Sequence, residues 1–235
     1  MSRGLGDVYK RQDQLSPVNR RVKIIQSVFF EEDNPTLESL AEQYLVSKTS
    51  LYNDLKIINE IIVSNGIEII SNNDGLTSQG AENEIQLAIK QLVTHFSNLI
   101  EEKSVNAKLY HFFEKQLVDI VSKILHKNFR ELTEKVSDYY MESLLTTLLV
   151  QCRRIQMGYH VEGEDDYLFS SIRYMETFVV ANDMSERLSQ ETVLNFSEAD
   201  KDYLSRQLFA HRVTTEVKAS DEKYVDLVYL SLIHI

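Results

Sequence analysis

Apolar residues recur at intervals of three and four in three successive segments near the start of the chain. This spacing is typical of amphipathic helices. Asn34-Pro35-Thr36 separates the first segment from the second. Ser47 is a good N-cap for the third, because its hydroxyl can accept a hydrogen bond from a free backbone N–H in the next turn. The apolar positions are Val22, Ile25, Val28 and Phe29, then Leu37, Leu40, Ala41 and Tyr44, then Leu51, Leu55, Ile58 and Ile62.

The third helix is expected to end at Gly66, and a different pattern follows it. Residues 67–70 (IEII) and 76–79 (LTSQ) are typical of short strands, and Asn72-Asn73-Asp74-Gly75 is typical of the turn between them. Three helices followed by a hairpin form the winged helix-turn-helix plan, which we assign to residues 16–92. In that plan the third helix lies in the major groove of DNA.

Polar residues occupy the face of the third helix opposite its apolar positions. Lys48, Tyr52 and Lys56 follow one another at four-residue spacing, and Thr49 and Asn53 lie beside them. These side chains suit phosphate oxygens and base edges. The same pattern would fit an ordinary solvated helix face, and a winged helix can also serve as a protein-docking module. The tight turn predicted at Leu45-Val46-Ser47, together with the cap and the wing, favours the DNA-binding interpretation.

The remainder of the chain has a helical pattern. Residues 101–104 (EEKS) are predicted to form a linker. Residues 105–213 are predicted to form helices joined by polar loops, with a loop at 163–166 and a helix at 168–180. Ser197 is predicted to cap the last helix, with Asp200 three residues on. The predicted fold is therefore mainly α, a winged helix-turn-helix domain followed by a helical-bundle domain. The apolar stripes of the bundle contain Leu109, Phe112, Phe113, Leu117, Ile120, Val121, Ile124, Met141, Leu144, Leu145, Leu148, Cys152 and Ile155.

Both ends of the chain differ from their neighbouring segments. Residues 1–12 (MSRGLGDVYKRQ) and 230–235 (LSLIHI) resemble translated adaptor or assembly scars, so we exclude them from the fold prediction. Frayed natural termini are the alternative interpretation. Residues 214–229 are a possible start of a further domain. If the ends are scars, the chain is an interior piece of a longer protein.

Composition narrows the class of protein. With 43% hydrophobic and 26% charged residues, the chain is expected to be globular. The net charge is −11, and residues 13–91 contain six Lys or Arg against twelve Asp or Glu, a balance of −6. DNA binding must therefore depend on where the few basic residues lie. The single Cys152 fits a reducing compartment. No apolar run is long enough to span a bilayer, so a cytoplasmic protein without a membrane partner is expected.

Motifs for catalysis are missing from the sequence. There is no glycine-rich phosphate loop, no G-x-S-x-G elbow and no H-E-x-x-H pair. His111 and His126 have no Cys or carboxylate at metal-ligand spacing. We therefore predict neither an enzyme nor a bound cofactor or metal.

Residues 37–89 resemble the Mga-type helix-turn-helix of regulators that contain a PTS-regulation domain (PRD). The matching stretches are LAEQYLVSKTSLYNDLK (residues 40–56) and DGLTSQGAENEIQLAI (residues 74–89), in which Gly75, Gly80 and Glu82 occupy the family's characteristic places after the wing. The resemblance implies that six residues face DNA: Ser47, Lys48, Thr49, Tyr52, Asn53 and Lys56.

The second region resembles a PRD itself. The matching stretches are VSDYYMESLLTTLLVQCRRIQMG (residues 136–158) and FSEADKDYLSRQLFAHR (residues 196–212). In the family these helices each present a histidine that accepts phosphate from phosphotransferase-system proteins, and the added charge alters how two copies pack. Here the two positions fall on Thr147 and Gln207, and His211, one turn after Gln207, is the best surrogate acceptor. An ordinary surface or interface histidine is the alternative for His211.

Three hypotheses follow. The leading one is a homodimeric or larger DNA-binding regulator, of the kind that activates carbohydrate-uptake or virulence genes, controlled through its PRD-like domain. The second is an RNA-binding antiterminator of the BglG type, which would begin with a small β-rich domain. The third is a partner-binding scaffold without a role in DNA binding, which the acidic balance favours.

Overall fold

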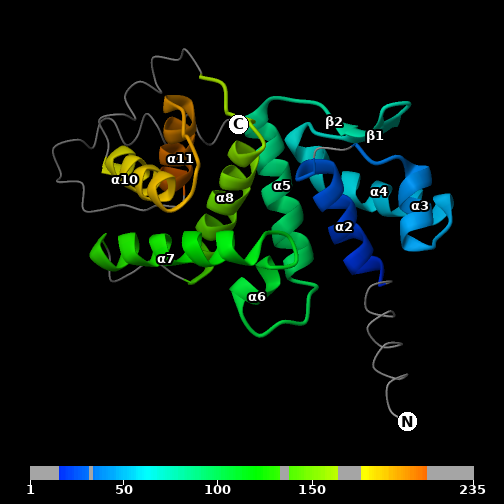
Figure 1. Ribbon diagram of the computed structural model, residues 1–235, viewed down its shortest axis with the longest axis horizontal. Coiled ribbons are helices and arrows are strands. Elements are labelled where there is room, and N and C mark those ends of the chain that lie inside the picture. The colour runs from blue at the N-terminus through cyan, green and yellow to red at the C-terminus, as the bar shows by residue number, and fades with distance from the viewer. Residues whose placement is uncertain (1–15, 32–33, 133–137, 164–175, 211–235) are drawn as a thin grey trace, which may run out of the picture.

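A computed structural model of the chain describes residues 16–31, 34–132, 138–163 and 176–210 (Figure 1). The predicted fold class is confirmed, because three helices precede a two-stranded hairpin and further helices follow it. The elements are α2 (Pro17–Phe29), α3 (Leu37–Tyr44), α4 (Lys48–Ile62), the 3₁₀ turn η1 (Val63–Asn65), β1 (Ile69–Asn72), β2 (Gly75–Ser78), α5 (Glu82–Ser97), α6 (Val105–Leu109), α7 (Lys115–Leu132), α8 (Asp138–Gln156), α10 (Glu176–Glu191) and α11 (Glu198–Ala210).

The first three helices begin at side-chain caps. Ser16, Thr36 and Ser47 each accept a backbone hydrogen bond from the residue three positions later, which satisfies a free N–H of the first turn. The Ser39 hydroxyl oxygen accepts the backbone N–H of Thr36 and completes a capping box. α3 ends at Leu45, whose left-handed backbone (φ 55°) turns the chain into α4. These local signals place α4 directly after the turn, as the sequence predicts.

The wing is an antiparallel hairpin with a two-residue turn. Asn72 pairs with Gly75 across it, and the backbone N–H of Asp74 donates to Asn72 Oδ1 at 2.9 Å. The first strand therefore starts and ends two residues later than predicted, because Asn72 belongs to the ladder and only Asn73 and Asp74 form the turn. The second strand starts and ends one residue earlier than predicted, and the pairing of the two strands is confirmed.

The helical region departs from its predicted pattern in two places. The apolar stripe of residues 109–124 is divided between α6 and α7, and the buried rings of Phe112 and Phe113 lie in the connection. α10 continues to Glu191, whereas the sequence prediction ended that helix at residue 180. Residues 164–175, which include most of the predicted loop and the start of that helix, lie outside the described residues.

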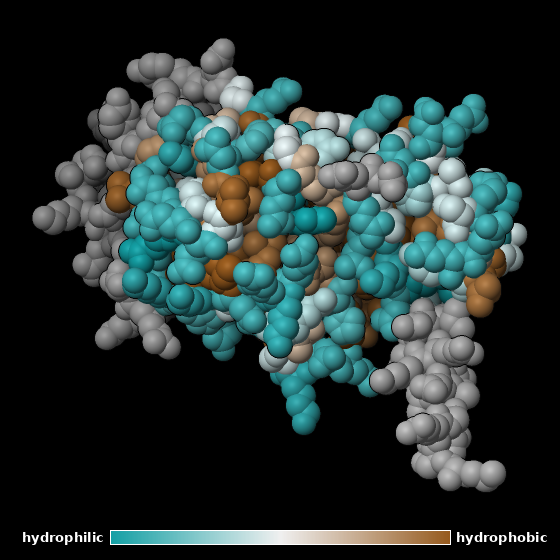
Figure 2. All heavy atoms as spheres, in the orientation of Figure 1, coloured by the Kyte–Doolittle hydropathy of each residue, from teal (hydrophilic) through white to brown (hydrophobic). Residues whose placement is uncertain are grey.

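A single buried core extends through both halves of the described chain. α5 packs against α2 and α4 on one side and against α8 on the other, so it joins the winged helix-turn-helix to the bundle (Figure 1). Hydrophilic residues cover most of the face in Figure 2, with smaller hydrophobic areas between them. None of the helices within the described ranges has the length and apolar character needed to cross a membrane.

Candidate nucleic-acid interface

The six residues predicted to face DNA lie together on the exposed side of α4 and its cap. We call Ser47, Lys48, Thr49, Tyr52, Asn53 and Lys56 the recognition strip; all six are classed as exposed. The exposed fraction is 58% for Tyr52, and 54% and 75% for the side chains of Lys48 and Lys56. The opposite face of α4 packs into the core. The strip is therefore accessible to a macromolecule without unfolding of the helix.

Ser47 differs from the rest of the strip because its side chain caps the helix to which the strip belongs. Its Oγ accepts the backbone N–H of Ser50 at 3.2 Å and lies 3.0 Å from the Ser50 hydroxyl. These contacts fix the first turn of α4. The structure thus gives Ser47 the geometry of a residue that positions the helix, whereas Thr49, Tyr52 and Asn53 present their side chains to solvent.

Both lysines of the strip have carboxylate neighbours. Lys48 Nζ forms a hydrogen-bonded ion pair with Glu38 of α3, and Lys56 Nζ lies 3.9 Å from Glu60, one turn later on α4. The hydrogen bond from Lys48 lowers the pKa of Glu38, and the positive charge of Lys48 adds to that effect. The positive charges of the strip are therefore compensated within the protein.

The buried side of α4 contains an ion-pair cluster that the sequence analysis missed. Asp54 is almost fully buried, and its two carboxylate oxygens accept Arg20 Nε at 2.5 Å and Arg21 Nε at 2.9 Å. Because both arginines belong to α2, the cluster fixes α4 against the preceding helix. An acidic residue between the apolar positions Leu51 and Ile58 was the one available sequence signal.

The wing is attached to the same helix. The side-chain amide of Asn59 donates to the carbonyl oxygen of Ile69 and accepts its backbone N–H, both at 2.9 Å. On the other strand, the N–H of Leu76 donates to the carbonyl of Pro35 at 2.8 Å. Gly75 has φ +107°, and an added Cβ there would lie 2.4 Å from the backbone oxygen of Asn34. These contacts hold the hairpin close to both α4 and the α2–α3 connection.

A buried ion pair joins the wing end to the helical bundle. Arg154 of α8 donates to both carboxylate oxygens of Glu82, at 2.8 and 2.6 Å, and to the carbonyl oxygen of Phe29 at 3.1 Å. Glu82 is the first residue of α5, immediately after the wing. The Arg154 guanidinium also lies 3.9 Å from the centre of the Tyr159 ring, in cation–π geometry. The orientation of α8 is therefore tied directly to the winged helix-turn-helix.

The three predicted regulatory positions have different surroundings. Thr147 is buried in α8, where its hydroxyl donates to the carbonyl of Ser143 at 2.9 Å. Gln207 is partly buried on α11, and His211 lies outside the described residues. The two described positions lie on different helices, and neither is fully exposed.

His160 has a carboxylate partner that the sequence analysis did not identify. Its Nδ1 lies 2.7 Å from Oδ2 of Asp200, and it is partly exposed while Asp200 is fully buried. Asp200 also accepts the backbone N–H groups of Val161 and Ser197 and the Ser197 hydroxyl. The predicted Ser197–Asp200 capping box is thus present, and it includes a histidine as well.

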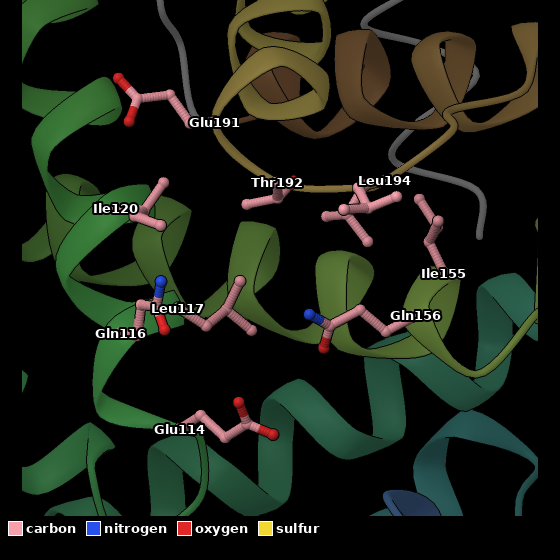
Figure 3. Close-up of a pocket in the computed structure, with 10 residues that line it drawn as sticks. Glu114, Gln116, Leu117, Ile120, Ile155, Gln156, Glu191, Thr192 and Leu194 are labelled. Atoms are coloured by element: carbon pink, nitrogen blue, oxygen red, sulfur yellow. The ribbon is translucent and has the colours of Figure 1, made fainter.

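A groove of about 440 Å³ lies between α7, the end of α8 and the α10–α11 connection (Figure 3). Leu117, Ile120 and Leu194 form part of its apolar lining, and Glu114 and Glu191 lie at its edge. The residues that line it include no lysine, arginine or histidine, so it lacks the side chains that bind nucleic-acid phosphates. Within the described ranges, no group of three His, Cys, Asp or Glu residues could hold a metal ion.

Comparison with known proteins agrees with the geometry of the first region. The comparison with curated proteins gives no match. Residues 16–93 match the family described as the Mga helix-turn-helix domain. The matched range begins at the cap of α2 and contains α3, α4, the wing and most of α5. Residues 16–93 are thus similar in sequence to an Mga helix-turn-helix domain, and their three helices and hairpin have the winged helix-turn-helix arrangement, which supports a role in DNA-binding transcription regulation.

Proposed function

We propose that the chain is a sequence-specific, double-stranded DNA-binding transcription regulator that reads its site with the recognition strip. The observation that carries this proposal is the exposure of all six strip residues on a helix that buried contacts hold beside a wing. Tyr52 and Asn53 supply base-reading groups, and Lys48 and Lys56 supply phosphate contacts. Ser47 fixes the start of the helix.

The helical region is proposed to control and assemble the regulator as a PRD-like domain covering residues 105–213. The two stretches that carry the PRD resemblance form α8 and α11, which are in contact through the hydrogen bond from Gln151 to the carbonyl of Asp200. On this proposal the regulator acts as a homodimer or larger oligomer, as an activator of carbohydrate-uptake or virulence genes. Burial of Thr147 argues against phosphate transfer from phosphotransferase-system proteins at that position.

The two alternative functions receive unequal support. An antiterminator of the BglG type requires a β-rich domain at the start, whereas residues 17–62 contain three helices. A partner-binding scaffold is favoured by the net charge of −11, which opposes association with phosphates. Selection of DNA by the purified chain distinguishes the scaffold from the regulator.

The test is enrichment of specific sequences from a library of random DNA duplexes at moderate salt. We expect the unmodified chain to enrich a defined site, and the variant Lys48→Ala/Tyr52→Ala/Lys56→Ala to lose the enrichment. A matched control is Lys23→Ala/Lys103→Ala/Tyr139→Ala, which removes the same residue types from exposed positions outside the strip. Retained binding by the strip variant, or equal loss in both variants, would contradict the proposal.

A further inference from the structure

We propose that Glu38 limits the affinity of the recognition strip for DNA. Its carboxylate accepts the Lys48 hydrogen bond that a DNA phosphate would otherwise accept. This inference rests on the proposed DNA-binding function. It assigns to Glu38 a regulatory effect on affinity, although the residue lies outside the strip. On this view DNA must displace a carboxylate from Lys48 before that lysine can contact the backbone.

The turn between α3 and α4 creates the contact. Glu38 lies in the first turn of α3, and Lys48 is the first residue of α4. Leu45, in the left-handed conformation, reverses the chain between them and brings the two side chains into hydrogen-bond contact. Both side chains are more than half exposed. Because neither group is desolvated, an incoming phosphate can replace the carboxylate without opening the core.

Helix dipoles favour an anion beside Lys48. The N-terminus of a helix carries a partial positive charge, which stabilises Glu38 in α3 and disfavours a cation such as Lys48 at the start of α4. A carboxylate or a phosphate beside Lys48 offsets this unfavourable interaction. Glu38 is a carboxylate at neutral pH because the ordinary pKa of glutamate is about 4.3. Its hydrogen bond with Lys48 lowers that pKa further. The protein itself thus supplies the anion when DNA is absent.

Lys48 is important for phosphate binding because several other basic residues of the domain are paired with carboxylates. Arg20 and Arg21 are committed to the buried Asp54. Lys56 is 3.9 Å from Glu60, and this ion pair within one helix lacks the direct hydrogen bond of the Glu38–Lys48 pair. Lys23 on α2 and Lys90 on α5 lie outside the recognition strip. The strip itself therefore has only Lys48 and Lys56 to offer phosphate, and freeing Lys48 is expected to have a measurable effect.

The test compares four variants on the enriched duplex: Glu38→Gln, Glu42→Gln, Lys48→Ala and Glu38→Gln/Lys48→Ala. Glu38→Gln keeps the shape of the side chain and is expected to tighten binding about fivefold at low salt, with a smaller gain as salt rises. Glu42→Gln removes the same charge from another exposed position of α3 and is expected to change affinity less than about twofold. The double variant is expected to bind no better than Lys48→Ala.

The outcomes separate this inference from the function on which it depends. If the unmodified chain binds and Glu38→Gln binds equally or more weakly, the inference fails while DNA binding stands. If the gain persists without Lys48, Glu38 acts by charge repulsion alone and the inference also fails. Absence of binding by every variant, with normal helical circular dichroism, would overturn both.

Discussion

Helices α4 and α8 contrast sharply, although similar apolar spacing predicted both. α4 buries one side and presents the recognition strip to solvent on the other. α8 is buried all round from Leu144 to Cys152 and lies among α5, α7 and α11 (Figure 1). A surface helix can offer side chains to a partner, whereas a buried helix can only influence its neighbours. The comparison therefore favours contact with DNA through α4 and internal coupling through α8.

Each of the two helices is anchored by a buried arginine–carboxylate contact. Asp54 ties α4 to α2, and Arg154 ties α8 to Glu82 at the start of α5. The Glu38–Lys48 pair is exposed and can exchange partners. Removal of one member of a buried pair leaves an uncompensated charge, which costs far more than loss of an exposed pair. The following predictions test this difference, beginning with the largest expected effect.

Asp54→Ala is expected to lower the free energy of unfolding by about 3–5 kcal/mol, because Arg20 and Arg21 would lose their shared carboxylate in a mostly buried position. Urea denaturation followed by circular dichroism measures the change. Asn53→Ala, at the exposed neighbouring position, is the control and should change stability by less than about 0.5 kcal/mol. A loss below about 1 kcal/mol for Asp54→Ala would show that α4 does not depend on this cluster.

Arg154→Ala is expected to cost about 3 kcal/mol, because Glu82 would remain buried without its cationic partner. Together with Glu82→Ala and the double variant it forms a cycle, for which we expect a coupling free energy of about 1–3 kcal/mol. Arg187→Ala, which breaks an i,i+4 ion pair on α10, is the control with an expected loss below about 0.5 kcal/mol. A coupling free energy near zero would show that the Arg154–Glu82 ion pair does not stabilise the packing of α8 against the winged helix-turn-helix.

The pH dependence of stability tests whether the Cys152 thiol of α8 is buried. Desolvation raises the pKa of its thiol from 9.0 to about 12 in the folded chain. Above about pH 9 the unfolded thiol loses its proton while the folded thiol keeps it, so stability falls as pH rises. Between pH 8 and pH 10, the free energy of unfolding of the unmodified chain should fall by about 1 kcal/mol more than that of Cys152→Ala. Identical pH dependence in the two proteins would contradict a desolvated thiol.

Ser47→Ala is expected to cost about 1 kcal/mol of stability because the N-cap of α4 is lost. The first turn of α4 should also fray, and this would weaken DNA binding through Lys48 and Thr49. Ser64→Ala, at an exposed position just after α4, controls for loss of a serine hydroxyl. If Ser47→Ala weakens DNA binding while stability stays unchanged, Ser47 contacts the duplex and does not merely cap the helix.

Local signals in the sequence predicted much of this architecture. The apolar spacing, the Ser47 cap and the Asp-Gly turn act over a few residues, and they located the starts of α3 and α4 and both strands of the wing to within two residues. The predicted end of α4 at Gly66 was wrong, because α4 ends at Ile62 and a 3₁₀ turn fills residues 63–65. The predicted end of α10 at residue 180 was wrong, because polar residues after Val180 are interspersed with further apolar positions that continue the buried stripe. That stripe contains Ala181, Met184 and Leu188, all fully buried.

The contacts that give the site its character could not be predicted in the same way. Arg20 and Asp54 are 34 residues apart, and Glu82 and Arg154 are 72 residues apart. Such pairs depend on how whole helices pack, which a single sequence does not reveal. Glu38 and Lys48 are only ten residues apart, yet their contact depends on the left-handed conformation of Leu45, a residue type that rarely adopts it.

The hydrogen bonds between Asn59 and Ile69 have one more consequence. They join β1 of the wing to α4, the helix that would enter the major groove. The distance between the wing and α4 is therefore fixed by contacts within the protein. On the proposed function, a duplex whose groove widths do not suit that separation would have to bend or twist to be bound. Base pairs that the protein never touches would then influence affinity through their stiffness, and stiff tracts placed between the contacts would be disfavoured.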